Sequence, residues 1–120
     1  MEYFFDSYAI IEIINGRESY LRFKDKIIIT TVLNLAEVYY ALLLKYGGKT
    51  VDKIVNNLNI DFIEITRTTA IEASFFRFKH KKLGMSYADC IGYVISLNNN
   101  LKFLTGDSAF ENLENVEFVM

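Results

Sequence analysis

Four acidic residues stand at places in the chain where their carboxylates could work together. Asp6 ends the apolar run Tyr3–Phe5, and Asp107 follows the apolar segment KFLTG. Asp89 stands near the start of ADCIGYVISL, and Glu37 lies inside NLAEVYYALLL. Burying several carboxylates together is unfavourable unless protons or a cation compensate their charge. No arginine or lysine lies within three residues of Asp6, Glu37 or Asp89. The pattern therefore favours a bound divalent metal ion.

The residue types also indicate which metal to expect. Carboxylate oxygens without paired histidines or thiols favour Mg²⁺ or Mn²⁺ over Zn²⁺. The chain has one histidine, His80, and one cysteine, Cys90, which together cannot make a conventional zinc site. We expect Cys90 to be a small core residue and His80, which lies in a charged run, to be solvated.

Each acid also has a local structural explanation. Aspartate accepts hydrogen bonds from free helix amides, so Asp6 and Asp107 could be helix N-caps. Asp89 stands three residues after Ser86, which matches the Ser-x-x-acid capping box. Glu37 could belong to the polar stripe of its helix, with Asn34, Ala41 and Lys45. Both interpretations remain open at this point.

The elements that must position these acids follow from the hydrophobic pattern. Apolar and β-branched runs predict strands, and longer apolar segments closed by glycine or asparagine predict helices. The expected strands are Tyr3–Phe5, Ile27–Thr31, Asp61–Thr66, Lys102–Thr105 and Val116–Val119. The expected helices are Tyr8–Ile14, Leu33–Tyr46, Val51–Leu58, Thr68–Lys82 and Tyr87–Leu97.

This alternation predicts an α/β fold with three layers, α/β/α, around a parallel sheet of about five strands. In such folds the site lies beyond the carboxyl ends of the strands, near the point where the strand order reverses. Asp6 and Asp107, which each follow a strand, should therefore lie on the same edge of the sheet.

Length and composition agree with one folded domain over residues 1–120. Hydrophobic residues make up 52% of the 120, and the formal net charge is −2. That charge does not indicate a general nucleic-acid binder, although it allows an enzyme that touches nucleic acid at one site. One cysteine, no basic signal-peptide start and no apolar run of the ~20 residues needed to span a membrane predict a cytoplasmic protein without membrane contact.

Four short motifs, in order, resemble a known family. FFDS, NLAEVYYAL, MSYADCIGYVISL and FLTGDSAF together resemble the PIN-domain family of metal-dependent ribonucleases. Among these, a compact single-domain chain is most similar to the VapC toxins of prokaryotic toxin-antitoxin pairs. The resemblance covers nearly the whole chain and implies the same three-layer fold, with the site at the strand ends.

The resemblance implies a role for each acid. Asp6, Asp89 and Asp107 would bind Mg²⁺ or Mn²⁺ directly or through water, and Glu37 would complete the shell or orient the attacking water. Ser7 and Thr105 match hydroxyl positions that support the site. RNA would be hydrolysed by in-line attack that leaves a 5′-phosphate and a 3′-hydroxyl. Which acid is the general base, and whether one or two metal ions bind, stays open.

The chain departs from the family beside the last acid, where many relatives carry basic residues that help to hold RNA. Here the segment is TGDSA, which has no positive charge. The basic run at residues 77–82 could supply phosphate contacts instead. Alternatively, these cations are a solvated helix end that suits the helix dipole. The run contains Arg77, Lys79, His80, Lys81 and Lys82.

The resemblance also implies two protein partners, a small antitoxin and a second copy of the chain in a homodimer. Five aromatic residues could serve these interfaces, although a place in the core is the default expectation for such side chains. They are Tyr39, Tyr40, Phe75, Phe76 and Phe78.

Two other functions share parts of this pattern, a receiver-like signalling domain and an inactive PIN-like binding module. A receiver-like signalling domain would have adjacent acids after its first strand and a phospho-accepting aspartate after its third, whereas here the third strand ends in Ile65-Thr66-Arg67. The second rival is an inactive PIN-like module that only binds RNA or protein. The presence of all four acids disfavours it, but the missing cations beside Asp107 leave it open.

Overall fold

Five short runs of aromatic and β-branched residues form the strands of one parallel sheet. The computed structural model describes residues 2–120, and its strand order is β3-β2-β1-β4-β5. Phe4 of β1 pairs with Ile29 of β2 and Phe103 of β4, so β1 lies at the centre. The strands are β1 (Tyr3–Phe5), β2 (Ile28–Thr30), β3 (Ile60–Phe62), β4 (Lys102–Thr105) and β5 (Val116–Phe118).

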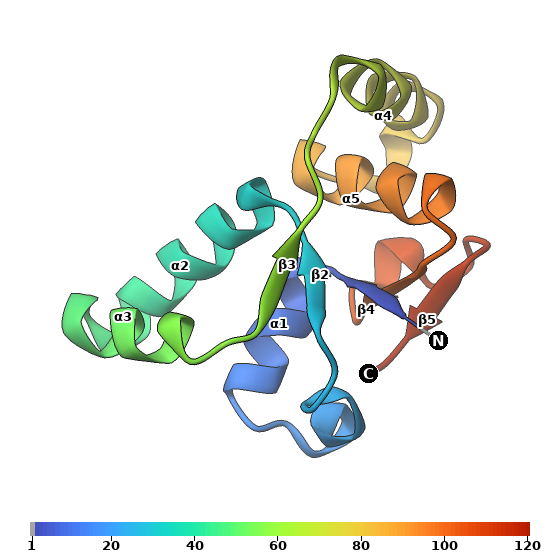
Figure 1. The fold of residues 1–120 in the computed structure, drawn as a ribbon. Coiled ribbons are helices and arrows are strands. Elements are labelled where there is room, and N and C mark those ends of the chain that lie inside the picture. Colours follow the sequence, from blue (N-terminus) through green and yellow to red (C-terminus); the bar gives the residue numbers. More distant parts are fainter. Residues whose placement is uncertain (1) are drawn as a thin grey trace.

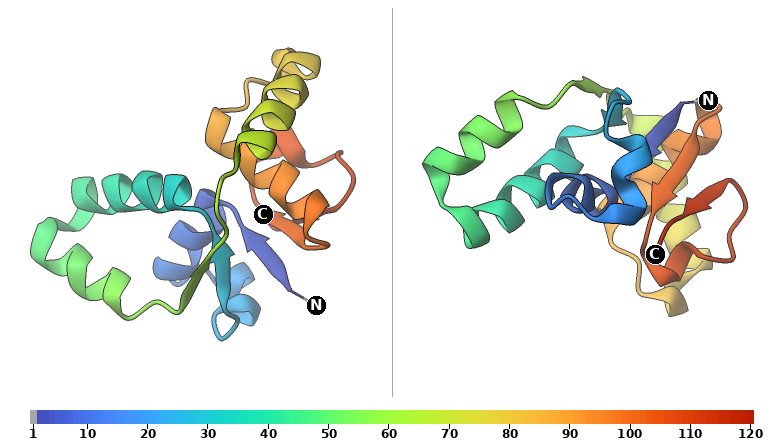
Figure 2. Two further views of the ribbon diagram at one scale, coloured as in Figure 1. Left: turned by 45° about the horizontal axis from the view of Figure 1, so that its top comes forward. Right: turned by 90° about the horizontal axis from the view of Figure 1, so that it is seen from below.

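Helices cover both faces of this sheet, so the predicted three-layer α/β/α fold is confirmed. Figure 1 shows α4 and α5 on one side of the sheet and α1, α2 and α3 on the other. The α2–α3 hairpin extends away from the strands (Figure 2). The α-helices are α1 (Ser7–Ile14), α2 (Val32–Tyr46), α3 (Gly48–Asn56), α4 (Arg67–Lys79) and α5 (Tyr87–Asn98). Three 3₁₀ helices are η1 (Glu18–Phe23), η2 (Lys81–Leu83) and η3 (Ser108–Phe110).

The central strands β1, β2 and β4 are largely buried on both faces, which accounts for their mostly apolar composition, whereas the edge strands β3 and β5 are more exposed. Successive side chains of a strand point to opposite faces. Phe4 and Phe103 therefore pack under α5, whereas Phe5 and Leu104 pack against α1 and α2. Two separate apolar cores hold the helices, and through them the acids, in fixed positions relative to the sheet.

Several expected boundaries differ from the structure. The strand expected at Asp61–Thr66 pairs only over β3, because its neighbour β2 ends at Thr30 and the chain there turns into α2. The helix expected at Thr68–Lys82 ends at Lys79, and after His80 the chain continues as η2. No element was expected at η1, where Tyr20 and Phe23 are buried.

The default expectation of a core position was wrong for three of the five aromatic residues. Tyr40, Phe75 and Phe78 are 65%, 71% and 72% exposed, because they lie on the outer faces of α2 and α4. Tyr39 and Phe76 do pack against the two cores.

Cys90 was expected in the core and His80 was expected to be solvated, and only the first expectation is confirmed. Cys90 is fully buried, as expected. His80 is half-buried rather than solvated, because its ring packs 4.5 Å from that of Phe76.

The helices were also compared with what a membrane-spanning segment needs. None of the helices in residues 2–120 has both the length and the hydrophobicity that crossing a bilayer requires.

Helix α5 approaches the sheet closely at Gly92, and this contact can be tested. A Cβ atom at Gly92 would lie 2.6 Å from Cε1 of Phe4 and 3.2 Å from Cε1 of Phe103. Both rings are fully buried and stacked on each other, so neither can move aside easily. We expect Gly92→Ala to lower the free energy of unfolding by about 1–3 kcal/mol, measured by urea denaturation. Gly48→Ala is the control, because the added Cβ would meet only Leu43 Cδ2 at 4.0 Å. Equal stability of the two variants would contradict the tight packing of α5.

Candidate functional site

The sheet reverses its strand order at the centre, and the acids gather there. From β1 the chain builds β2 and β3 on one side, then crosses over to build β4 and β5 on the other. Ligands of open parallel sheets bind beyond the carboxyl ends of the strands at such a switch point. Asp6 follows β1, and Thr105 ends the neighbouring strand β4. The expected placement of Asp6 and Asp107 on one edge of the sheet is thus confirmed.

Asp6 is the most deeply buried of the four acids, with 3% of its surface exposed. The backbone N–H of Ser7 donates to its Oδ1 at 2.9 Å, and the hydroxyl of Thr105 donates to its Oδ2 at 2.7 Å. Thr105 Oγ1 in turn accepts a hydrogen bond from the backbone N–H of Asp107 at 3.0 Å. One buried hydroxyl therefore connects the acid after β1 with the acid after β4.

The electrostatics show that three of the acids act on one another. Burial raises the pKa of Asp6 from its usual 3.8 to about 7, and the charges of Asp89 and Asp107 add to the increase. The hydrogen bonds from Thr105 and Ser7 oppose it. Burial also raises the pKa of Asp89, with a further increase from the charge of Asp107. These three carboxylates therefore repel one another across the carboxyl edge of the sheet.

Local caps hold Asp89 and Asp107 in place, as the structural interpretation predicted. Ser86 and Asp89 form a reciprocal capping box at the start of α5. Asp107 accepts a hydrogen bond from the N–H of Ala109 and begins η3. Each acid uses one carboxylate oxygen in its cap. Asp89 Oδ1 and Asp107 Oδ2 receive no hydrogen bond from any residue within 2–120. Capping and a shared site are therefore compatible.

Glu37 reaches the site through Ser7. The hydroxyl of Ser7 donates to Glu37 Oε1 at 2.7 Å and accepts a hydrogen bond from Asn34 Nδ2 at 2.9 Å. Asn34 Oδ1 accepts from the hydroxyl of Thr31 at 2.7 Å, and both Asn34 and Thr31 are fully buried. Glu37 itself is exposed on α2. A chain of hydrogen bonds therefore runs from buried Thr31 at the start of α2 to the exposed carboxylate of Glu37.

Asn34 and Thr31 were not among the site residues expected from the sequence. The available signal was the position of Asn34, one helical turn before Glu37 on the same polar stripe. The sequence could not show that this stripe faces Ser7, because that contact joins residues 27 and 30 positions apart.

Close packing also fixes the loop between Thr105 and Asp107. A Cβ atom at Gly106 would lie 2.3 Å from Tyr8 Cε1 and 2.7 Å from the backbone oxygen of Val119. Only glycine fits at this approach, so Asp107 is presented from a backbone pressed against α1 and the end of β5.

The donor set suits a hard divalent cation by its chemistry. All the donors are oxygens, and neither of the two ion pairs found in residues 2–120, Arg17–Glu12 and Arg22–Glu117, involves a site acid. Over the same residues, however, the structure contains no group of three or more acidic, histidine or cysteine side chains close enough together to hold a metal ion. The carboxylates of Asp6, Asp89 and Asp107 therefore affect one another's pKa without forming a compact shell.

The basic run expected to contact RNA lies at the end of α4 and in η2. The Nε of Arg77 donates to the backbone oxygen of Met85 at 3.0 Å, just before Ser86 and the start of α5. Lys79, Lys81 and Lys82 are exposed. Their contact with RNA stays a prediction.

The raised pKa of Asp6 gives a pH test of the metal-free protein. The folded state keeps a proton on Asp6 that the unfolded state has already released, so the free energy of unfolding should fall as pH rises from about 4 to about 7. Asp6→Asn should remove this pH dependence. The free energy of unfolding of this variant should exceed that of the native chain by on the order of 2–4 kcal/mol at pH 8 and be about equal to it at pH 4. Urea unfolding in EDTA measures this. Parallel curves of unfolding free energy against pH for the native and Asp6→Asn chains would refute the prediction. Asp25→Asn, which changes an exposed acid, is the control and should follow the native curve.

A second test addresses the buried amide of Asn34. Asn34→Ala leaves the hydroxyls of Thr31 and Ser7 without their partner, so we expect about 1–3 kcal/mol less stability in urea unfolding. Asn56→Ala, at the exposed end of α3, should change stability by less than about 0.5 kcal/mol. Equal effects at both positions would show that the hydrogen-bonded chain contributes nothing.

Known structures share this architecture. Mycobacterium tuberculosis VapC20, described as a Sarcin-Ricin loop cleaving toxin, aligns with a TM-score of 0.81 at 14% identity, over 99% of this chain and 100% of that one. VapBC2 from Rickettsia felis, bound to a DNA fragment from its promoter, gives 0.74 at 16% identity over 100% of both chains. A toxin-antitoxin complex from Klebsiella pneumoniae gives 0.74 at 16% identity, over 97% and 96%.

The sequence itself settles the family. No curated protein matches the chain by sequence. The family model described as the PIN domain matches residues 3–116, from the first strand to the start of the last. This span contains all four acids, the Ser7–Asn34 chain and the whole sheet except the end of β5. The chain therefore belongs to the PIN domain family.

Proposed function

We propose that this chain is a Mg²⁺- or Mn²⁺-dependent endoribonuclease and the toxin of a VapBC-like toxin-antitoxin pair, acting in the cytoplasm as one catalytic domain. The observation that carries the proposal is the mutual electrostatic effect of Asp6, Asp89 and Asp107 at the switch point of a PIN-domain sheet. Buried carboxylates that repel one another and have no lysine or arginine partner are a favourable setting for a divalent cation.

In this proposal Asp6, Asp89 and Asp107 hold the ion. The caps of Asp89 and Asp107 each leave one carboxylate oxygen without a hydrogen bond, whereas both oxygens of Asp6 also accept hydrogen bonds from the protein. When bound, such an ion supplies positive charge that stabilises a developing phosphate charge and lowers the pKa of a water molecule. Thr105 fixes one oxygen of Asp6, which leaves the carboxylate little freedom to rotate.

Glu37 has a different proposed role. Its Oε1 is fixed by Ser7, whereas its exposed position on α2 leaves Oε2 open to water. We assign Glu37 the orientation of the attacking water, with Ser7, Asn34 and Thr31 as positioning residues.

Two exposed apolar patches support the proposed protein partners, a small antitoxin and a second copy of the chain. One patch lies on α2, where Tyr40 and Leu44 are 65% and 74% exposed. The other lies on α4, where Ile71 and Phe75 are exposed beside a strongly apolar hollow. Exposed apolar patches on a small protein mark interaction surfaces. The toxin-antitoxin complexes among the similar structures support the same assignment.

The function is tested by metal-dependent cleavage of a mixed RNA pool. We expect cleavage with Mg²⁺ or Mn²⁺ and none in EDTA. Asp107→Asn should lower the rate at least about 10–100-fold, because it replaces a proposed metal ligand. Asp25→Asn removes an exposed acid after η1 and should keep full activity. Induced in a bacterial host, the native chain should arrest growth and Asp107→Asn should not.

The outcomes separate the alternatives. Equal cleavage by the native chain and Asp107→Asn would indicate a contaminant or another site. Absence of cleavage at every Mg²⁺ and Mn²⁺ concentration, with the protein folded, would instead support the inactive PIN-like binding module.

A further inference from the structure

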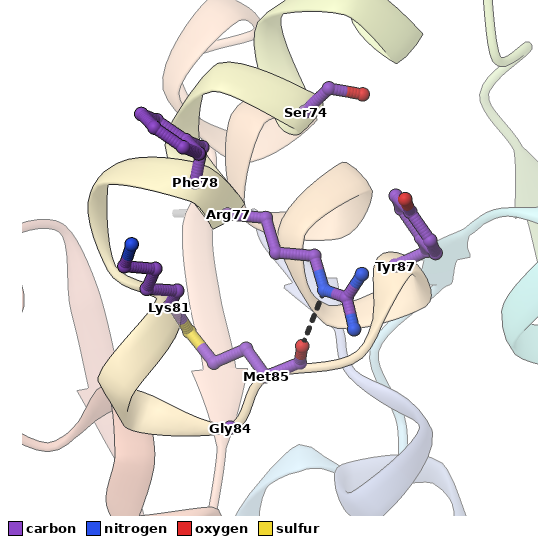
Figure 3. A pocket seen from close by; sticks show the side chains of 7 residues that line it. All are labelled: Ser74, Arg77, Phe78, Lys81, Gly84, Met85 and Tyr87. Atoms are coloured by element: carbon purple, nitrogen blue, oxygen red, sulfur yellow. Dashed lines mark hydrogen bonds between the residues drawn. The ribbon is translucent and has the colours of Figure 1, made fainter.

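A pocket beside the acidic site combines cations with aromatic rings. It lies between the end of α4 and the start of α5 and has a volume of about 540 Å³, within the range of about 300–1,000 Å³ typical of ligand sites. Figure 3 shows Arg77 extending across it, between Phe78 and Lys81 on one side and Tyr87 on the other.

The guanidinium of Arg77 is held in place before any ligand arrives. Its Nε donates to the backbone oxygen of Met85 at 3.0 Å, and its Cζ lies 4.2 Å from the centroid of the Tyr87 ring. Neither Nη1 nor Nη2 makes a hydrogen bond or an ion pair with any residue in 2–120. A fixed guanidinium with free, planar N–H donors suits the bidentate binding of a phosphate.

The rings around Arg77 suit a nucleobase. Phe78 and Tyr87 are 72% and 57% exposed, so much of each ring is open to a ligand. Lys81 Nζ lies 5.2 Å from the Phe78 ring, so each ring is paired with a cation. Aromatic faces interleaved with cations are typical of surfaces that bind single-stranded nucleic acid. An acidic peptide would need the cations but not the exposed rings.

The pocket is also placed to deliver a strand to the carboxylates. Tyr87 is the first residue of α5, and Asp89 lies in the same turn. No acidic residue lies between Glu72 and Asp89, whereas one arginine and three lysines lie at positions 77–82. No cation stands beside Asp107 in the sequence, but cations lie at the end of α4 and in η2, where Arg77 contacts the start of α5.

We propose that this pocket is a nucleotide-binding subsite for single-stranded RNA, with Arg77 and Lys81 on phosphate oxygens and Phe78 and Tyr87 stacking bases next to the scissile bond. This inference rests on the proposed nuclease function for the identity of the strand, but the binding itself can be measured separately.

The test is fluorescence anisotropy of a labelled random-sequence 12-nucleotide RNA, with the full chain in EDTA to prevent cleavage. Arg77→Ala should weaken binding about 10-fold and reduce the dependence of log Kd on log salt by about 1. Phe78→Ala or Tyr87→Ala should weaken it about 5–100-fold with little change in that slope. Arg77→Lys, which keeps the charge but loses the planar fork, should lie between native and Arg77→Ala.

Matched controls keep the test specific and independent of folding. Lys49→Ala and Phe62→Ala remove an exposed cation of α3 and an exposed ring of β3, both outside the pocket, and should bind RNA as the native chain does. Phe78 is mostly exposed, so Phe78→Ala should have the same urea midpoint of unfolding as the native chain, even if Arg77→Ala is destabilised.

The outcomes distinguish this subsite from the nuclease function. If the native chain cleaves RNA and the pocket variants match it in both Kd and KM, the subsite is overturned while the nuclease stands. Binding lost in the pocket variants without any cleavage by the native chain would support the subsite alone. Binding of an acidic glutamate-rich peptide but not of RNA would assign the pocket to a protein partner and overturn the proposal.

Discussion

The hydrogen bond from the Thr105 hydroxyl to the Asp6 carboxylate is the contact on which the site depends. It joins the carboxyl ends of β1 and β4, the two strands between which the chain reverses direction across the sheet. Both residues are buried, so the carboxylate is desolvated and its pKa is raised to about 7. Folding thus produces a carboxylate that water does not stabilise, and a cation or a proton must take over that role.

The helices around this contact position the other groups through their own termini. The capping box of α5 fixes Asp89, and the cap of η3 fixes Asp107. On the opposite face, Thr31 caps α2 and begins the hydrogen-bonded chain that ends at Glu37. Capping, which stabilises a helix by satisfying its free amides, also aims each carboxylate at the edge of the sheet. Stability and placement of the site come from the same hydrogen bonds.

Positive charge lies next to this acidic edge but not among the carboxylates. A lysine or arginine among the carboxylates would neutralise them and compete with a metal ion. The basic residues instead stand at the end of α4 and in η2, where Arg77 is anchored by Met85 and Tyr87. In the proposed function, such a division would let one surface attract an anionic strand while the adjacent acids keep the negative charge that a cation requires.

The sequence by itself determined the α/β/α class and the approximate positions of the strands, because short apolar runs such as YFF and the FL of KFLT are each followed by a polar residue. It also identified the four acids and the capping box at Ser86–Asp89, since both are local patterns. Only the tertiary structure decided that Asn34 and Thr31 hold Ser7, that Phe78 and Tyr87 are exposed beside Arg77, and that β3 ends early. Those features depend on contacts between residues far apart in the chain and on which helix face meets the sheet. The spacing of residues within one segment cannot specify either.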